Sequence, residues 1–130
     1  MVKLSNHTFL PMNKIIPISI RTKEFSLRMI KAYSWLKNQN QECAIIGKQL
    51  FRSSLSVGAN AWEAEAGQSL KDKISKLEIS RKECVESQYW LILLIDSELV
   101  PKAKFQPLLD ECIEIGKILT ATVKTLKNKL

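Results

Sequence analysis

The chain has 130 residues, of which 45% are hydrophobic and 25% are charged, and these values are typical of one globular domain. Lysine and arginine number 20 against 13 acidic residues, and the resulting net charge of +7 permits binding to RNA, DNA or an anionic membrane surface. Three cysteines without paired spacing are typical of reduced thiols and predict a cytoplasmic protein. No stretch approaches the roughly 18 apolar residues of a membrane span, and the first residues lack the apolar core of a signal peptide. A membrane-spanning or disulfide-stapled protein is therefore excluded.

The first part of the chain divides into an arm and a helix. Residues 1–18 include two prolines and show no period, so they are predicted to form an irregular N-terminal arm, whereas residues 19–130 are predicted to form one helical domain. The first helix is expected to begin near Ser19 to Thr22, which are plausible N-caps, and to end near Lys37. Apolar side chains recur on it at helical spacing, namely Phe25, Met29, Ile30, Tyr33 and Leu36.

A second helix is predicted from about Glu42 to just before Gly67. Its inward stripe changes from apolar to small residues, in the order Ile46, Leu50, Ser54, Val57, Ala61 and Ala64. Gly58 lies inside this helix, where it costs roughly 1 kcal/mol relative to alanine. It indicates either a close contact with a neighbouring helix or a bend at a functional site, and the small residues around it favour the close contact.

The third helix is predicted to start after Ser69, which is a good N-cap with Asp72 in the acidic first turn, and to end near Glu98. Residues 90–95 of this helix are apolar almost all round. A helix that is apolar on every side is covered on every side, so this segment indicates self-association.

The fourth helix is predicted from about Phe105 to Asn128, with Pro101 and Pro107 bracketing its start. It carries two adjacent apolar stripes, which exceed what the core of a single bundle needs. The helix lengths and short turns predict an all-α fold, an up-down-up-down antiparallel four-helix bundle that assembles further.

The motifs of the second and third helices resemble a known family. They are Gln49-Leu50-Phe51-Arg52-Ser53, Ser56-Val57-Gly58-Ala59-Asn60, Glu63-Ala64, Asp72, Lys76-Leu77, Lys82-Glu83 with Glu86, and Tyr89-Trp90-Leu91. In this order they are similar to the four-helix-bundle family of 23S ribosomal RNA intervening-sequence proteins, over roughly residues 20–128. The resemblance implies a ring-like homopentamer and implies no established enzymatic activity. A more distant branch resembles accessory proteins of diversity-generating retroelements, which bind a reverse transcriptase and nucleic acid. The chain departs from the family pattern at Trp62 and at Gly67-Gln68.

Residue types that commonly carry catalysis are sparse. His7 is the only histidine and lies in the predicted arm, so neither a nucleophile–histidine pair nor a histidine-containing metal motif is expected in the body. Cys43, Cys84 and Cys112 are expected to act as buried, reduced, small hydrophobic residues. We therefore expect no metal, no cofactor and no enzymatic activity.

A polar stripe on the second and third helices has two interpretations. Its members are Arg52, Asn60, Glu63, Arg81, Glu83 and Glu86. The first interpretation, which we favour, is an ion-pair network that fixes the register of helices or subunits. In that case Glu63→Ala should lower thermal stability by leaving a cation unpaired. The alternative is a small hydrolase or transferase that uses Glu63 with Glu83 or Glu86 as paired carboxylates.

Basic charge is concentrated at the two ends of the chain. Residues 1–40 hold seven lysines or arginines and one acid, and residues 101–130 hold six and three, whereas residues 41–100 hold seven and nine. Two basic helix faces are predicted to bind nucleic acid, and their residues are Arg21, Arg28 and Lys31 on the first helix and Lys117, Lys124 and Lys127 on the fourth. A merely solvated surface is the competing interpretation of both.

These observations predict a non-enzymatic, oligomeric nucleic-acid-binding or scaffold protein that binds the backbone of RNA or DNA through those two faces. The alternative partner-binding role is that of an accessory subunit for a reverse transcriptase and its template RNA. Five aromatic residues could stack on bases or fill subunit contacts, namely Trp35, Phe51, Trp62, Tyr89 and Trp90. Of these, Trp62 and Trp90 are expected at subunit contacts, because their neighbours are apolar or acidic.

Overall fold

The computed structural model describes residues 16–130. Residues 1–15 of the predicted arm, including His7, therefore lie outside the described residues. The described part holds four α-helices and no strand, so the all-α prediction is confirmed. The helices are α2 (Ile18–Leu36), α3 (Gln41–Glu65), α4 (Leu70–Asp96) and α5 (Lys102–Lys127).

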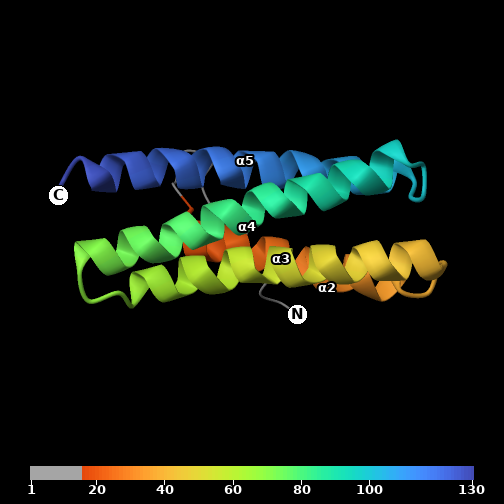
Figure 1. Cartoon of the computed structure of the whole chain (residues 1–130), viewed down its shortest axis with the longest axis horizontal. Coiled ribbons are helices and arrows are strands. Elements are labelled where there is room, and N and C mark those ends of the chain that lie inside the picture. Colours follow the sequence, from red (N-terminus) through yellow and green to blue (C-terminus); the bar gives the residue numbers. More distant parts are fainter. Residues whose placement is uncertain (1–15) are drawn as a thin grey trace.

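The four helices pack side by side as an elongated bundle, and the chain reverses direction at each of the three connections (Figure 1). Each helix packs against the next along the chain, and α2 and α5 meet as well. The contact between α3 and α4 is the most extensive of the four, and that between α2 and α5 is the smallest. The bundle therefore has one tight seam and one loose seam.

The start of α2 differs from the prediction, because neither Ser19 nor Thr22 caps the helix. The helix begins at Ile18 after Pro17, whose φ of −55° leads the chain into the first turn. Both hydroxyls are buried and donate hydrogen bonds, that of Ser19 to the Glu65 carboxylate at the end of α3 and that of Thr22 to the Ile18 carbonyl at 2.8 Å. Both residues are good N-caps by local propensity, but here their side chains are buried within the bundle and donate hydrogen bonds instead of capping α2.

The start of α4 agrees with the prediction, since the Ser69 hydroxyl accepts a hydrogen bond of 3.1 Å from the backbone N–H of Asp72.

Helix α5 begins at Lys102, three residues before the predicted start, and it includes Pro107. A proline in the second turn removes one hydrogen bond, to the carbonyl of Ala103, and Ala103 is exposed to water. The cost is therefore small enough for the helix to begin early.

Gly58 marks the closest approach of α2 and α3. A Cβ atom at this position would lie 2.7 Å from Ser26 Oγ and 3.3 Å from the Thr22 carbonyl oxygen, both on α2. The glycine is buried and α3 continues through it without interruption. The close-contact interpretation of Gly58 is thus confirmed, and α2 lies directly on the α3 backbone.

Small buried hydroxyls line the seam between α3 and α4. The Ser53 and Ser87 hydroxyls lie 2.9 Å apart, and the Ser80 hydroxyl donates to the Val57 carbonyl at 2.7 Å. All three serines are fully buried, and within residues 16–130 no buried side-chain nitrogen or oxygen lacks a hydrogen-bond partner. Because serine is small and its hydroxyl is satisfied here, the two helices can pack closely along this seam.

The three cysteines are free and buried, as predicted. Cys84 of α4 and Cys112 of α5 face each other with their sulfur atoms 3.7 Å apart. The hydrogen bond between the two sulfurs and the burial of both raise the pKa of Cys112, so this thiol stays protonated. The pair therefore fills the core between α4 and α5 as small apolar side chains do.

Candidate functional site

A groove of about 280 Å³ runs along the loose seam between α2 and α5. This surface, the α2–α5 groove, is lined by Arg28, Lys31, Ala32, Trp35, Lys104, Phe105 and Leu108. Phe105 and Leu108 are buried and form an apolar floor, whereas the three cations are exposed at the rim. No acidic side chain lines it, so an anion in the groove would meet positive charge on both helices.

The cations of the α2–α5 groove are not neutralised within the described part of the chain. No acid of residues 16–130 forms an ion pair with Arg28, Lys31 or Lys104. Lys104 instead places its ammonium 4.5 Å from the centre of the Trp35 ring, a cation–π contact. Trp35 in turn packs on Phe105, with ring centres 5.7 Å apart and planes tilted by 49°.

Sequence reasoning missed Lys104 as a member of this site, and it gave Trp35 only as one of five aromatic residues that could stack on bases or fill subunit contacts. Lys104 was placed ahead of the predicted helix start at Phe105, so it was assigned to no helix face. With the true start at Lys102, Lys104 lies within α5 and faces α2. Trp35 lies seven residues after Arg28, which is two helical turns along the same side of α2, and that spacing was the available signal.

Arg21 lies on the same seam but is neutralised. Its guanidinium donates two hydrogen bonds to the Glu111 carboxylate, at 2.8 and 2.9 Å. This hydrogen bonding raises the pKa of Arg21 above the ordinary value, against the opposing effect of burial. Arg21 therefore ties α2 to α5 and is not a free phosphate contact.

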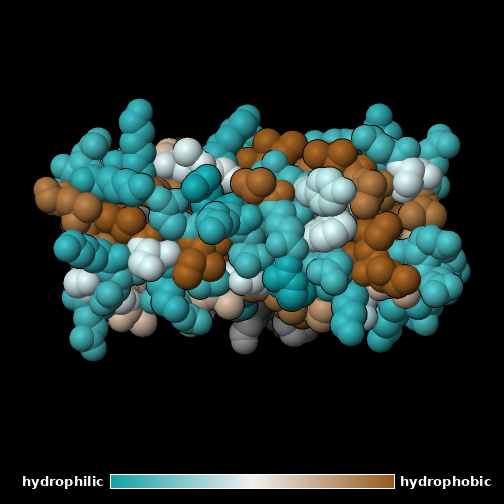
Figure 2. Space-filling model, in the orientation of Figure 1, coloured by the Kyte–Doolittle hydropathy of each residue, from teal (hydrophilic) through white to brown (hydrophobic). Residues whose placement is uncertain are grey.

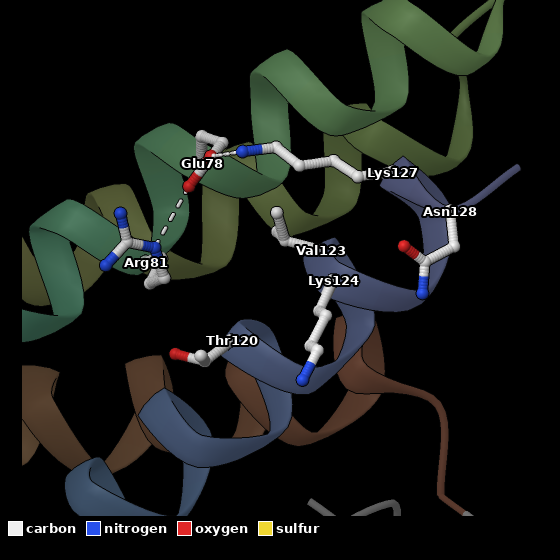
Figure 3. A pocket seen from close by; sticks show the side chains of 7 residues that line it. All are labelled: Glu78, Arg81, Thr120, Val123, Lys124, Lys127 and Asn128. Carbon is white, nitrogen blue, oxygen red and sulfur yellow. Dashed lines mark hydrogen bonds and ion pairs between the residues drawn. The ribbon is translucent and has the colours of Figure 1, made fainter. Parts of the chain in front are cut away.

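A second groove, of about 360 Å³, lies between α4 and α5 near the C-terminal end of the chain. This α4–α5 groove is lined by Glu78, Arg81, Thr120, Val123, Lys124, Lys127 and Asn128. Figure 3 shows Glu78 between Arg81 and Lys127, which approach its carboxylate to 3.0 and 2.8 Å. The hydrogen bonds from Lys127 and, to a smaller extent, from Arg81 lower the pKa of Glu78, so its carboxylate stays charged and offsets two cations. The α4–α5 groove is therefore larger than the α2–α5 groove but less basic.

The six cations predicted to bind nucleic acid therefore do not form one surface. Arg28 and Lys31 line the α2–α5 groove, whereas Lys124 and Lys127 line the α4–α5 groove on the other side of α5. Lys117 is exposed and lies 3.3 Å from the Glu114 carboxylate on its own helix. Of the six, Arg28, Lys31 and Lys124 are the ones without an ion pair to a residue in 16–130.

The polar stripe of α3 and α4 consists of separate contacts. Arg52 pairs with Glu86 and, at 3.4 Å, with Glu83, and Glu86 also accepts a 3.0 Å hydrogen bond from the Trp90 indole N–H. The hydrogen bond from Trp90, and secondarily that from Arg52, lower the pKa of Glu86. This part of the stripe is a local ion-pair cluster that joins the outer edges of α3 and α4.

The remaining members of the stripe have other partners. Glu63 lies 2.7 Å from Lys76, and the Asn60 amide donates to the Ser56 carbonyl of its own helix at 2.9 Å. Glu63 follows Arg52 by eleven residues on α3, which corresponds to about 16 Å of helix. Glu63 is thus not brought to Glu83 or Glu86, and the carboxylate pair is not assembled within one chain.

Large apolar side chains also remain exposed in the described part of the chain. Trp62 of α3 and Val85 and Tyr89 of α4 are each more than half exposed, and Ile92 is 42% exposed. Figure 2 shows hydrophobic patches among hydrophilic side chains across the face that α3, α4 and α5 present. Val85, Tyr89 and Ile92 recur at helical spacing and form one stripe, here called the α4 stripe.

Residues 16–130 contain neither a helix that could span a membrane nor a cluster of side chains that could hold a metal ion. No helix there is long and apolar enough to cross a membrane. No group of three or more histidine, cysteine, aspartate or glutamate side chains is arranged there to hold a metal ion.

Four packed helices with basic grooves at their seams define a small helical-bundle protein. The chain belongs to the family of 23S rRNA-intervening sequence proteins, whose sequence profile matches residues 17–121, and this confirms the resemblance seen in the sequence. A solved structure from Bacteroides thetaiotaomicron, a protein of unknown function from the S23 ribosomal protein family, is 37% identical, covers 82% of this chain and 98% of its own, and superposes with a TM-score of 0.77. No curated protein matches the chain.

Proposed function

We propose that this chain is a non-enzymatic protein that binds the phosphate backbone of RNA or DNA through the α2–α5 groove. The observation that carries the proposal is the set of three exposed cations, Arg28, Lys31 and Lys104, none of which is ion-paired with an acid of residues 16–130. Cations that are not already neutralised gain most from releasing counterions at a phosphate backbone. The net charge of +7 acts in the same direction by attracting polyanions.

The proposal is for backbone binding with little sequence preference. Lysine and arginine on exposed helix faces can contact phosphates, whereas neither groove presents an asparagine, glutamine or arginine array on a helix shaped to enter a major groove. The proposal of an RNA ligand is also supported by the description of the family, which is 23S rRNA-intervening sequence protein.

Assembly into a ring of antiparallel, up-down-up-down bundles, most simply of five chains, completes the proposal. The α4 stripe of Val85, Tyr89 and Ile92 leaves apolar surface in water that a neighbouring copy would cover. A ring would repeat a weak groove several times, and one strand that reaches several copies would bind with avidity. Native mass spectrometry at micromolar protein should show the assembled mass, and Tyr89→Asp should lower it to that of the single chain.

The same stripe is also where a partner enzyme such as a reverse transcriptase would bind, as in the accessory-subunit alternative. A monomer in native mass spectrometry would leave the α4 stripe free and would favour this alternative over the ring. An assembled ring that buries Val85 and Tyr89 would favour the first proposal. Differential hydrogen exchange of α4 at high and low protein concentration separates the two outcomes.

Binding is tested by fluorescence anisotropy with labelled RNA and DNA at several salt concentrations. Affinity should fall steeply with salt, and reversing Arg28, Lys31 and Lys104 together to glutamate should reduce the log–log slope by roughly 2 to 3, since each phosphate contact contributes about 0.7 to 0.9. The variant should keep the helical circular dichroism of the wild type, because the three side chains are exposed at the groove rim.

A matched control reverses three exposed cations elsewhere, Lys48, Lys71 and Lys82, with the same change in net charge. These lysines lie on α3 and α4 and have no ion pair with a residue of 16–130. The control should weaken binding less than the groove variant. Equal losses in both would show a diffuse charge effect, and no binding by wild type at low salt would reject the proposal.

A further inference from the structure

We infer that the α2–α5 groove takes an unpaired nucleotide, with the base against Trp35 and the adjoining phosphates on Arg28, Lys31 and Lys104. The inference rests on the proposed function and deepens it, because it names a single strand as the ligand. Its basis is that the three unneutralised cations surround an apolar, aromatic floor rather than a polar one.

The composition of the groove separates it from an ordinary basic surface. Trp35 is half-buried, and the floor beneath it is made by the buried side chains of Phe105 and Leu108. A phosphate alone gains nothing from such a floor, whereas a base gains both stacking and removal of its faces from water. The α4–α5 groove has cations as well, but its lining contains no aromatic side chain and includes Glu78.

Lys104 lies where a bound base could displace its ammonium from the Trp35 ring. Its ammonium lies 4.5 Å from the centre of the Trp35 ring, so it covers the aromatic surface while the groove is empty of base. The lysine stem is flexible and the residue is exposed, so the ammonium can move from the ring to an adjacent phosphate. The base replaces a cation–π contact by stacking, which is the stronger contact in water, and the charge gains a phosphate partner.

The size of the groove also favours one unpaired nucleotide. Its volume of about 280 Å³ is at the lower end of the range for small-molecule sites. In a duplex the bases are stacked on each other and cannot reach Trp35, so only the phosphates would contact the rim. We therefore expect single strands to bind more tightly than duplexes of the same length.

The test uses the full chain with Trp62→Phe and Trp90→Phe, so that Trp35 is the one tryptophan. Trp62 is exposed, and Trp90 is half-buried against the core, where phenylalanine keeps an aromatic ring, so the double variant should retain the fold, which circular dichroism checks. A thymidine DNA 12-mer should quench Trp35 fluorescence. An abasic 12-mer and a 12-base-pair duplex should not quench it.

Affinity is measured in parallel by anisotropy on the wild-type chain. The thymidine strand should bind at least about fivefold more tightly than the abasic strand, the effect of one stacked base. Lys104→Glu should weaken binding of the thymidine strand more than Lys48→Glu, which makes the same charge change on exposed α3 surface outside the groove.

The outcomes distinguish the two proposals. Equal binding of thymidine and abasic strands without quenching overturns the unpaired-nucleotide inference and leaves the backbone-binding function standing. Absence of binding to all three probes at low salt overturns both. If the double variant fails to fold, the comparison of thymidine and abasic strands on wild type still decides the inference.

Discussion

The seam between α3 and α4 and the seam between α2 and α5 are built from opposite kinds of residue. Between α3 and α4, the fully buried hydroxyls of Ser53, Ser80 and Ser87 find partners across the seam or in their own helix. Between α2 and α5, by contrast, a groove remains and three exposed cations line it. We call the buried α3–α4 seam the closed seam and the α2–α5 seam, which carries the groove, the open seam.

Under the proposed function, this difference would separate the residues that stabilise the bundle from those that bind a ligand. Small residues bring α3 and α4 close, and close packing without unsatisfied polar atoms stabilises the folded state. The open seam needs less packing because Arg21 and Glu111 join α2 to α5 through two parallel hydrogen bonds. The open seam can therefore keep exposed charges that would weaken a buried core, and these are the charges that the proposal assigns to a polyanion.

The largest expected effect comes from filling the closed seam. Ser53→Leu inserts a bulky side chain against Ser87, where the two hydroxyls lie 2.9 Å apart in a fully buried contact. Overpacking of this kind costs about 1 to 3 kcal/mol or more, and for a chain of this size we expect the melting temperature to fall by roughly 5 to 15 °C. Thermal unfolding followed by circular dichroism measures it.

The matched control is Ser53→Ala, which removes the hydroxyl and adds no bulk. Ser87 keeps its hydrogen bond to the Glu83 carbonyl at 2.9 Å, so no buried donor is orphaned and the loss should be about 1 kcal/mol or less. If Ser53→Leu were as stable as Ser53→Ala, the seam would have spare room and the contrast between the two seams would be wrong.

The next effect concerns Gly58, which holds α2 against α3 and so supports one wall of the open groove. Gly58→Ala should gain about 1 kcal/mol of helix propensity but lose more to the contact with Ser26 Oγ at 2.7 Å, giving a net decrease in the melting temperature. Adding Ser26→Ala removes that oxygen and should restore part of the loss. A rise in stability with Gly58→Ala alone would contradict the close-contact interpretation.

The sequence predicted helices α3 and α4 and the contact of α3 with α2 better than it predicted the open seam. Helical periodicity and the run of small residues identified α3, α4, the Ser69 cap and the Gly58 contact, because these depend on local spacing and on size. The α2–α5 groove was predicted only in part, since Arg28 and Lys31 were on a basic face but Lys104 was left outside a helix. Which cations are neutralised depends on pairs such as Arg21 with Glu111, ninety residues apart, and no local pattern encodes them.

Acid should weaken the closed seam by a smaller amount. The pKa of Glu86 is lowered by its hydrogen bonds from Trp90 and Arg52, so the stabilisation is present above the unfolded-state value of about 4.3 and is lost as the pH falls through the lower folded-state value. Wild type should therefore lose more stability than Glu86→Gln as the pH falls from about 6 to about 3, a range that spans the unfolded-state pKa. Melting temperatures of both proteins across this range test the sign, and parallel curves would show that Glu86 contributes nothing.

The smallest expected effect is that of Glu63→Ala at the outer edge of the closed seam. The sequence-based expectation was that this change lowers thermal stability by leaving a cation unpaired. The cation is Lys76, and the Glu63 and Lys76 side chains are 56% and 41% exposed. Water solvates Lys76 once the carboxylate is gone, so the change in unfolding free energy should be within about 0.5 kcal/mol. Urea unfolding of Glu63→Ala, Lys76→Ala and the double variant gives the coupling between the two charges. A coupling well above 1 kcal/mol would mean that the pair is shielded from water, as it would be if a second copy covered this edge in an assembly.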